Sequence, residues 1–141
     1  MAEHVIVRQD AEFRTQFWTE EETEDGIGKM QEANHIHQLN PYSMMLASLG
    51  SCTAIVLNTY AEHHRMPLGG VEVELFYKRN YRKDCDTFEQ TDSYNEEVIE
   101  KMKFLGQLTD AEKEKLLHIA HACPIYKMFK EGIPIHTEMQ S

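Results

Sequence analysis

The segment from Asn40 to His64 constrains the fold of this chain most, because its first half is apolar on nearly every side of a helix. Asn40 supplies an N-cap side chain and Pro41 fits the first helical position, so this pair predicts a helix that runs to about His64. A helix that is apolar all round is buried all round. Its small residues let another backbone approach closely; they are Ala47, Ser48, Gly50, Ser51 and Ala54. The segment therefore predicts a central helix with a close neighbour.

Two of the three cysteines lie on apolar helical stripes. Cys52 shares one face of the central helix with Met45, Leu49 and Val56. Cys123 shares a face of a second helical pattern with Leu116, Ile119 and Ala120. Both thiols are therefore predicted to point toward a core. Two inward thiols on separate helices could form a buried reactive pair, and they could equally be ordinary core packing.

The remaining patterns predict strands around these two helices. Alternating apolar positions and turn residues favour strands at residues 5–7, 13–18, 27–33, 71–78, 96–105 and 133–138. The second helix is predicted from Asp110, after a capping box formed by Thr109 and Glu112, to about Cys123. Pro124 is interpreted as part of a segment that leaves this helix. Segregated strands and two main helices indicate an α+β class.

Bulk properties exclude several classes of protein. A length of 141 residues fits one domain, so we expect a single domain over residues 1–141. The net charge of -10 argues against nucleic acid as a partner. The longest apolar stretch, residues 44–56, is shorter than the roughly 20 residues of a membrane span. No secretion signal is recognised, and the odd number of cysteines does not suit a disulfide framework, so a cytoplasmic location is expected.

No metal or cofactor is predicted from the residue pattern. His118 and His121 are three residues apart, but no second ligand group has a recognised metal-binding spacing. Cys85 follows Asp84 in the polar, turn-rich stretch 80–95, and we interpret it as an exposed or structural residue rather than a redox group.

Taken in order, these residues resemble the OsmC/Ohr family of osmotically inducible and organic hydroperoxide resistance proteins. The run from Asn40-Pro41 to Cys52-Thr-Ala resembles the first cysteine helix of the family, and Ala120-His-Ala-Cys123-Pro124 resembles its second cysteine motif. The segments between them follow the same order and spacing; they are Tyr60–Glu62, Pro67–Leu68, Gly70–Val73, Asp84–Cys85 and Gly106–Thr109. The resemblance covers roughly residues 40–138.

The resemblance implies a tightly intertwined homodimer, in which two bent sheets wrap central helices from both subunits. It also implies a thiol peroxidase. Cys52 would attack a hydroperoxide and become a sulfenic acid, and Cys123 would then attack that sulfur to close a disulfide. A small thiol or a lipoyl-bearing protein would restore both thiols.

Activation of Cys52 is where the sequence departs from the family pattern. The nucleophile must be a thiolate, and burial raises the pKa of a thiol. In the hydroperoxide branch of the family, an N-terminal arginine held by a glutamate after the proline supports the thiolate. Here Tyr42 and Ser43 follow Pro41, so that carboxylate is missing. Arg14 is the candidate activator, because it lies on a predicted strand before the helix.

The leading hypothesis is a thiol-dependent hydroperoxide reductase that works as a homodimer. Its substrates would be organic hydroperoxides, since the thiols lie among apolar side chains suited to apolar tails. Two alternatives remain open. The first is a redox sensor or thiol switch with slow turnover, which the missing carboxylate favours. The second is a non-catalytic protein that binds a small molecule in an apolar pocket.

Overall fold

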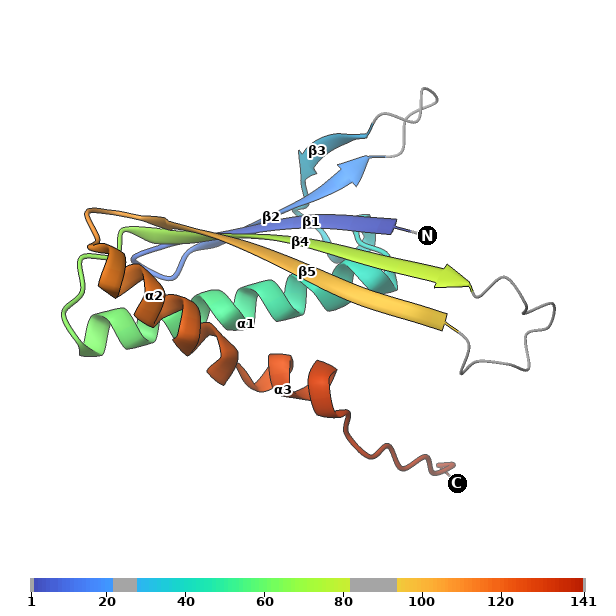
Figure 1. Ribbon diagram of the computed structural model, residues 1–141. Coiled ribbons are helices and arrows are strands. Elements are labelled where there is room, and N and C mark those ends of the chain that lie inside the picture. Colours follow the sequence, from blue (N-terminus) through green and yellow to red (C-terminus); the bar gives the residue numbers. More distant parts are fainter. Residues whose placement is uncertain (1, 22–27, 82–93, 141) are drawn as a thin grey trace.

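A computed structural model describes residues 2–21, 28–81 and 94–140 of the chain. Five antiparallel strands form one sheet in the order β3-β2-β1-β4-β5 (Figure 1). The strands are β1 Ala2–Asp10, β2 Thr15–Glu21, β3 Lys29–Glu32, β4 Gly70–Tyr81 and β5 Tyr94–Leu105. The helices are η1 Ile36–Gln38, α1 Pro41–His63, α2 Asp110–Ile119, η3 Ala120–Ala122 and α3 Pro124–Glu131. The predicted α+β class is confirmed.

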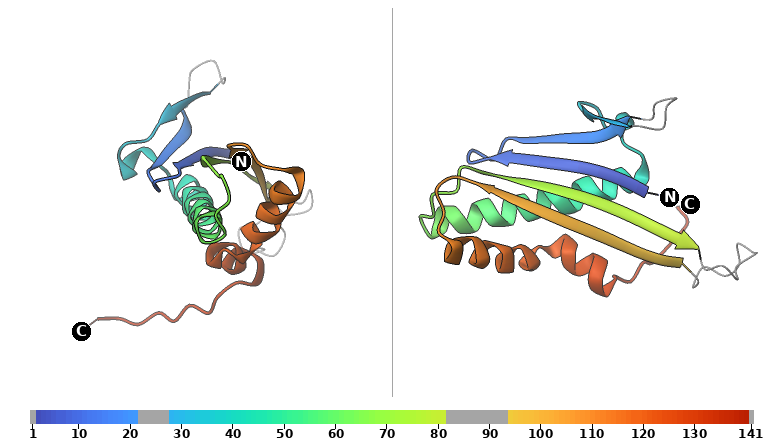
Figure 2. Two further views of the ribbon diagram at one scale, coloured as in Figure 1. Left: turned by 90° about the vertical axis from the view of Figure 1, so that its left-hand side faces the viewer. Right: turned by 45° about the horizontal axis from the view of Figure 1, so that its top comes forward.

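The core lies between the sheet and α1, and the helices α1, α2 and α3 all lie on one face of the sheet (Figure 2). Alternate positions of the two central strands point toward α1, as the period of two in a strand requires. These inward residues are fully or almost fully buried: Val5 and Val7 on β1, and Val71, Val73, Leu75 and Tyr77 on β4. On α1 the matching buried residues are Leu46, Leu49, Gly50, Ala54 and Leu57.

The start of α1 follows the predicted cap. The Asn40 side chain accepts a hydrogen bond from the Ser43 backbone N–H at 2.9 Å, and Pro41 takes the first helical position. The close neighbour predicted for the small residues is the sheet at Gly50, whereas Ser48 is exposed. A Cβ atom added to Gly50 would lie 2.6 Å from Val7 Cγ2 and 2.8 Å from Leu75 Cδ1, so any larger residue here requires these side chains or the helix to shift.

The prediction that α1 is buried all round is wrong for the single chain. Met44 and Ile55 are 37% and 48% exposed, on the side of the helix that faces away from the sheet. The helix is long and apolar enough to cross a membrane by length and composition, and half of its apolar window is buried within the fold. One sheet covers only one side of a helix, so the apolar residues on the other side of α1 have no cover from the described part of the chain.

The second helical pattern divides into three elements, which corrects the predicted helix from Asp110 to Cys123. The capping box at Thr109 is confirmed, with the Glu112 backbone N–H donating to the Thr109 hydroxyl at 3.1 Å. However, α2 ends at Ile119 and gives way to the short turn η3. Pro124 does not leave a helix but begins α3, with Cys123 as the N-cap residue. Proline favours this position because its missing N–H is not needed there.

Two other predicted strand boundaries differ from the structure. Residues 133–138 form no strand, and Ile135 is 83% exposed in a segment that extends away from the body (Figure 1). An extended segment needs a neighbouring strand for stability, and the described sheet does not offer one to this segment. Near the N-terminus, β2 starts at Thr15 rather than at Phe13, because Phe13 adopts a positive φ of 65° in the turn that follows β1.

Candidate thiol site and adjoining pocket

The structure brings Cys52 and Cys123 together. Cys52 lies in the middle of α1 and is half-buried, whereas Cys123 is fully buried at the junction of η3 and α3. The two thiols are near enough for Cys123 to contribute to the raised pKa of Cys52. Both thiols belong to the core, as the helical stripes predict, and they also form a pair. The contact comes from the chain reversal through α2 and η3, which returns residue 123 to the middle of α1 (Figure 1).

The first turn of α3 supplies a second contact to Cys52. The backbone N–H of Ile125 is near enough to the Cys52 sulfur to lower the pKa of this thiol. Ile125 is the second residue of α3, and the N-cap residue Cys123 makes no side-chain capping bond of its own. The first N–H groups of a helix have no partner inside the helix, so a sulfur from another helix can fill this role. An N–H at a positive helix end favours the thiolate over the thiol.

Burial nevertheless dominates the protonation of Cys52. Loss of solvent raises the pKa of the Cys52 thiol above its ordinary value, and the neighbouring Cys123 thiol raises this pKa further. The Ile125 N–H lowers the pKa and only partly compensates. In the described part of the chain, no cation is among the groups that shift this pKa. In the single chain, Cys52 is therefore a thiol at neutral pH. The Ile125 amide is placed to stabilise the negative charge when the thiolate forms.

Arg14 lies at the turn between β1 and β2. Its Nε donates to an Asp10 carboxylate oxygen at 2.9 Å, a second nitrogen lies 3.8 Å from Glu12, and the side chain is 79% exposed. These partners hold the guanidinium at the turn, so nothing in the described chain links it to Cys52. Its role as the activating cation stays a prediction.

A different arginine lies at the start of α1. Arg79, near the end of β4, donates from Nη1 to the Tyr42 hydroxyl at 3.2 Å, and its guanidinium carbon lies 5.6 Å from the centre of the Tyr42 ring. Tyr42 occupies the position after Pro41 at which the family resemblance places a glutamate. The structure therefore pairs an arginine with this position through a tyrosine, which the sequence analysis did not anticipate because Arg79 follows α1 in the chain.

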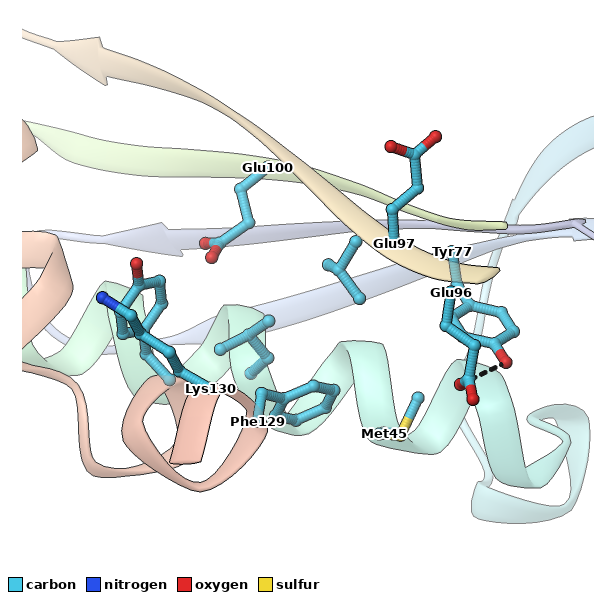
Figure 3. A pocket seen from close by; sticks show the side chains of 10 residues that line it. Met45, Tyr77, Glu96, Glu97, Glu100, Phe129 and Lys130 are labelled. Atoms are coloured by element: carbon cyan, nitrogen blue, oxygen red, sulfur yellow. Dashed lines mark hydrogen bonds between the residues drawn. The ribbon is translucent and has the colours of Figure 1, made fainter. Parts of the chain in front are cut away.

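A partly open pocket of about 490 Å³ lies near the thiol pair, and neither cysteine is among its lining residues. It lies between α1, α3 and the inward face of β5 (Figure 3). Leu49, one turn before Cys52, and Tyr126, in the first turn of α3, connect the pocket to the thiol site. The other lining residues are Met45, Tyr77, Glu96, Glu97, Val98, Glu100, Phe129 and Lys130. The volume and the apolar and aromatic lining are typical of a site for a small organic molecule.

Glu100 is the unusual residue of this pocket. It occupies an inward position of β5, opposite Leu75 of β4. Its Oε2 atom is buried and makes no hydrogen bond with any described residue. Burial raises the pKa of this carboxyl above its ordinary value of 4.5. A buried carboxylate oxygen without a hydrogen-bond partner costs stability, and a proton or a bound donor group would remove that cost.

Replacing Glu100 by glutamine is expected to stabilise the free protein at neutral pH. The raised pKa means that the folded protein binds this proton more tightly than the unfolded chain, so the charged form disfavours folding above the folded-state pKa. We expect the melting temperature to rise by roughly 1–3 °C, a small effect because the group is partly solvated. The difference should vanish below about pH 4, where both states are protonated. Scanning calorimetry of Glu100→Gln against Glu114→Gln, at an exposed position of α2 outside the pocket, measures the difference. An equal rise in both variants would contradict this account.

The sequence contains a signal for this pocket that the sequence analysis missed. Val98, Met102 and Phe104 share a strand face in the predicted pattern, and Glu100 falls on the same face between them. A charged residue among inward positions indicates either a buried pair or a binding site. In the described residues, no group of three or more His, Cys, Asp or Glu side chains is placed to hold a metal ion. Cys85 lies outside the described residues.

Comparison with known proteins identifies the family. Residues 32–138 match the model of the family described as OsmC-like protein, which covers most of the chain, so the chain belongs to the OsmC-like family. A search of curated protein sequences finds no match.

Among solved structures, the fold is similar to that of an OsmC-like hydroperoxide resistance protein from Jannaschia sp. CCS1, with a TM-score of 0.64 and 9% sequence identity over 99% of this chain and 94% of that chain. An organic hydroperoxide resistance protein OsmC from Legionella pneumophila aligns with a TM-score of 0.48 and 16% identity, over 84% of this chain and 82% of that chain. At such low identity, the likeness to the Jannaschia protein shows the fold alone.

Proposed function

We propose that this protein reduces organic hydroperoxides with the thiol pair Cys52 and Cys123. The observation that supports the proposal is the proximity of the two thiols at the N-terminus of α3, where Cys123 is the N-cap residue and the Ile125 N–H is near enough to lower the pKa of Cys52. Two core cysteines that merely fill space need not lie together beside a helix amide. Membership of the family and the likeness to hydroperoxide resistance proteins support the same reaction class.

The reaction needs two steps. In the first, the Cys52 thiolate attacks the terminal oxygen of the hydroperoxide, so that an S–O bond forms and the O–O bond breaks. The alkoxide leaves and takes a proton to become an alcohol. In the second, the Cys123 sulfur attacks the Cys52 sulfenic acid, a disulfide forms, and hydroxide leaves and is protonated to water. The two thiols supply the two electrons, and a small thiol or a lipoyl-bearing protein is the proposed reductant that returns them.

The expected product of one turnover without reductant is a disulfide between Cys52 and Cys123. Treating the fully reduced protein with one equivalent of cumene hydroperoxide should remove two of its three thiols and lower its mass by about 2 Da. Peptide mapping should place the new bond between residues 52 and 123. The rate should rise with pH through the neutral range, because burial raises the pKa of Cys52 and the thiolate reacts. Unchanged thiols after exposure to an excess of peroxide would rule the proposal out.

A thiol switch is the second candidate function. It is favoured by one observation: burial raises the pKa of Cys52, and no described cation lowers it. A scarce thiolate reacts slowly, which suits a sensor better than a scavenger. Steady-state measurements with a dithiol reductant separate the two functions. A peroxidase turns over many equivalents of peroxide rapidly, whereas a switch forms the same disulfide but turns over slowly.

We also propose that the working form is a homodimer. The exposed apolar side of α1 is continuous with a hollow of about 520 Å³, whose lining includes Phe17, Ile36, Leu39 and Met44. Uncovered apolar surface of this kind is typical of an interface. The species in sedimentation velocity should have twice the mass of the 16.5 kDa chain. A charged substitution at Ile55, on the exposed side of α1, should shift it toward the monomer, while Lys103→Glu on the outer face of β5 should not.

A further inference from the structure

The pocket beside the thiols has a polar wall that an apolar substrate tail does not require. β5 contributes Glu96, Val98 and Glu100 from alternate positions, which all face inward opposite residues of β4. Figure 3 shows the Glu100 carboxylate directed into the space between β5 and the helices, and the Glu97 carboxylate directed away from it. The opposite wall is apolar and aromatic, with Leu49 from α1 and Phe129 from α3.

The two inward carboxylates, Glu96 and Glu100, differ in whether they already have a hydrogen-bond partner. Glu96 already accepts a hydrogen bond from the Tyr77 hydroxyl at 2.9 Å, and this contact, with burial, raises the pKa of Tyr77 to about 12. Glu100 has no described partner for its buried oxygen. Among the lining residues, the positive group is Lys130, an exposed residue in the last turn of α3, for which the described chain shows no ion pair with either carboxylate. Arg79 of β4 lies opposite Glu96 in the strand register. Glu100 is therefore the open acceptor of the pocket.

We infer that this pocket holds the organic part of the hydroperoxide and selects substrates that carry a hydrogen-bond-donating or cationic group over those that carry a carboxylate, with Glu100 as the specificity-determining residue. The inference rests on the proposed function and adds a substrate class to it. A buried acceptor gains most from a charged donor, and aromatic rings such as those of Tyr126 and Phe129 also favour a cation. A substrate carboxylate in the same place would be repelled by the negative charges of Glu96 and Glu100, and it would also lose its hydration.

The test compares three hydroperoxides of one shape: cumene hydroperoxide, its para-aminomethyl derivative and its para-carboxy derivative. Stopped-flow measurement of thiol loss gives the rate constant of each with the reduced wild-type protein. We expect the amine to react at least about 10-fold faster than the carboxylate, with the neutral compound between them. Glu100→Gln should reduce this ratio by about fivefold, and the smaller remaining preference is assigned to Glu96.

Glu114→Gln is the matched control, because it changes the net charge equally at an exposed position of α2 that does not line the pocket. It should leave the ratio unchanged. Equal rates for the three hydroperoxides, or an equal effect of both variants, would overturn the assignment of the pocket.

A second readout separates this inference from the proposed reaction. The alcohols formed from the three hydroperoxides bind without reacting, and calorimetry with Cys52→Ser measures their affinities. If the amino alcohol binds more tightly than the other two and Glu100→Gln loses this preference, the pocket assignment is supported. This holds even if no hydroperoxide oxidises the thiols, in which case only the peroxidase proposal fails. Rapid oxidation of the thiols without any preference among hydroperoxides or alcohols leaves the peroxidase standing and removes the pocket assignment.

Discussion

Replacing Cys52 by serine is expected to lower the rate of hydroperoxide consumption by about three orders of magnitude, to the background of the solution. A serine hydroxyl stays protonated at neutral pH and is a poor nucleophile toward a peroxide oxygen. The fold should tolerate the change, because Cys52 is only half-buried. The backbone N–H of Ile125, which lies near the sulfur, can also donate a hydrogen bond to a serine oxygen. Peroxide consumption with a dithiol reductant measures the effect, and a circular dichroism spectrum checks the fold.

The companion variant Cys123→Ser should behave differently from Cys52→Ser. Its first turnover should proceed at a rate similar to that of the wild type, because Cys52 is intact, and the sulfenic acid should persist and react with dimedone. Later turnovers should slow, since the buried partner that closes the disulfide is gone. Cys85→Ser, which removes the third cysteine, is the control and should keep full activity. If Cys52→Ser and Cys85→Ser consume peroxide equally fast, Cys52 is not the nucleophile.

Replacing Gly50 by valine is expected to destabilise the protein by about 3 kcal/mol or more, which corresponds to a fall in melting temperature of roughly 10 °C. Gly50 lies where α1 comes nearest to the sheet, and an added Cβ would already lie 2.6 Å from Val7 Cγ2. The two extra methyl groups of valine must push the helix away from β1 and β4 or force side chains off their rotamers. Thr59→Val, at an exposed position of the same helix, should change stability little.

A double-mutant cycle identifies the contact responsible. Gly50→Ala crowds the contact with the sheet, but alanine also stabilises the helix by up to about 1 kcal/mol relative to glycine. Its net loss of stability is therefore smaller than that of Gly50→Val. Val7→Ala leaves a void that costs about 2 kcal/mol. In the double variant the new methyl group fills part of that void, so the combined loss should be smaller than the sum by at least about 1 kcal/mol. If the losses in free energy of unfolding of the two single variants simply add in the double variant, Val7 is not the residue that restricts side-chain size at position 50.

The main helix and the strands could be predicted from the sequence because local signals fix them. Asn40 with Pro41 marks the start of α1, and the alternation from Val71 to Tyr77 marks β4. The predictions are wrong where the structure of a segment depends on a neighbouring segment. Ile133 and the residues after it have a strand pattern, but a strand forms only beside another strand. The exposed side of α1 has the composition of a buried surface, and the described sheet covers only the other side.

The thiol pair could be predicted only in part. The helical stripes place Cys52 and Cys123 toward the core, but spacing along the chain does not show that they meet, because the path through α2 and η3 determines the contact. The amide of Ile125 was missed because Pro124 was taken as the end of a helix rather than the start of the next. The inward position of Glu100 could have been recognised from the strand pattern, whereas its lack of a partner required the three-dimensional arrangement.

The position of Cys123 gives the two redox states different shapes at the pocket. This residue is the N-cap of α3, and α3 carries Tyr126, Phe129 and Lys130 of the pocket wall. Two unbonded thiols lie farther apart than the sulfur atoms of a disulfide, which are about 2.05 Å apart, so oxidation draws the start of α3 toward α1. The wall then shifts as a unit with its helix. Closing the disulfide should therefore narrow the space between α1 and α3, and reduction should reopen the pocket for the next substrate.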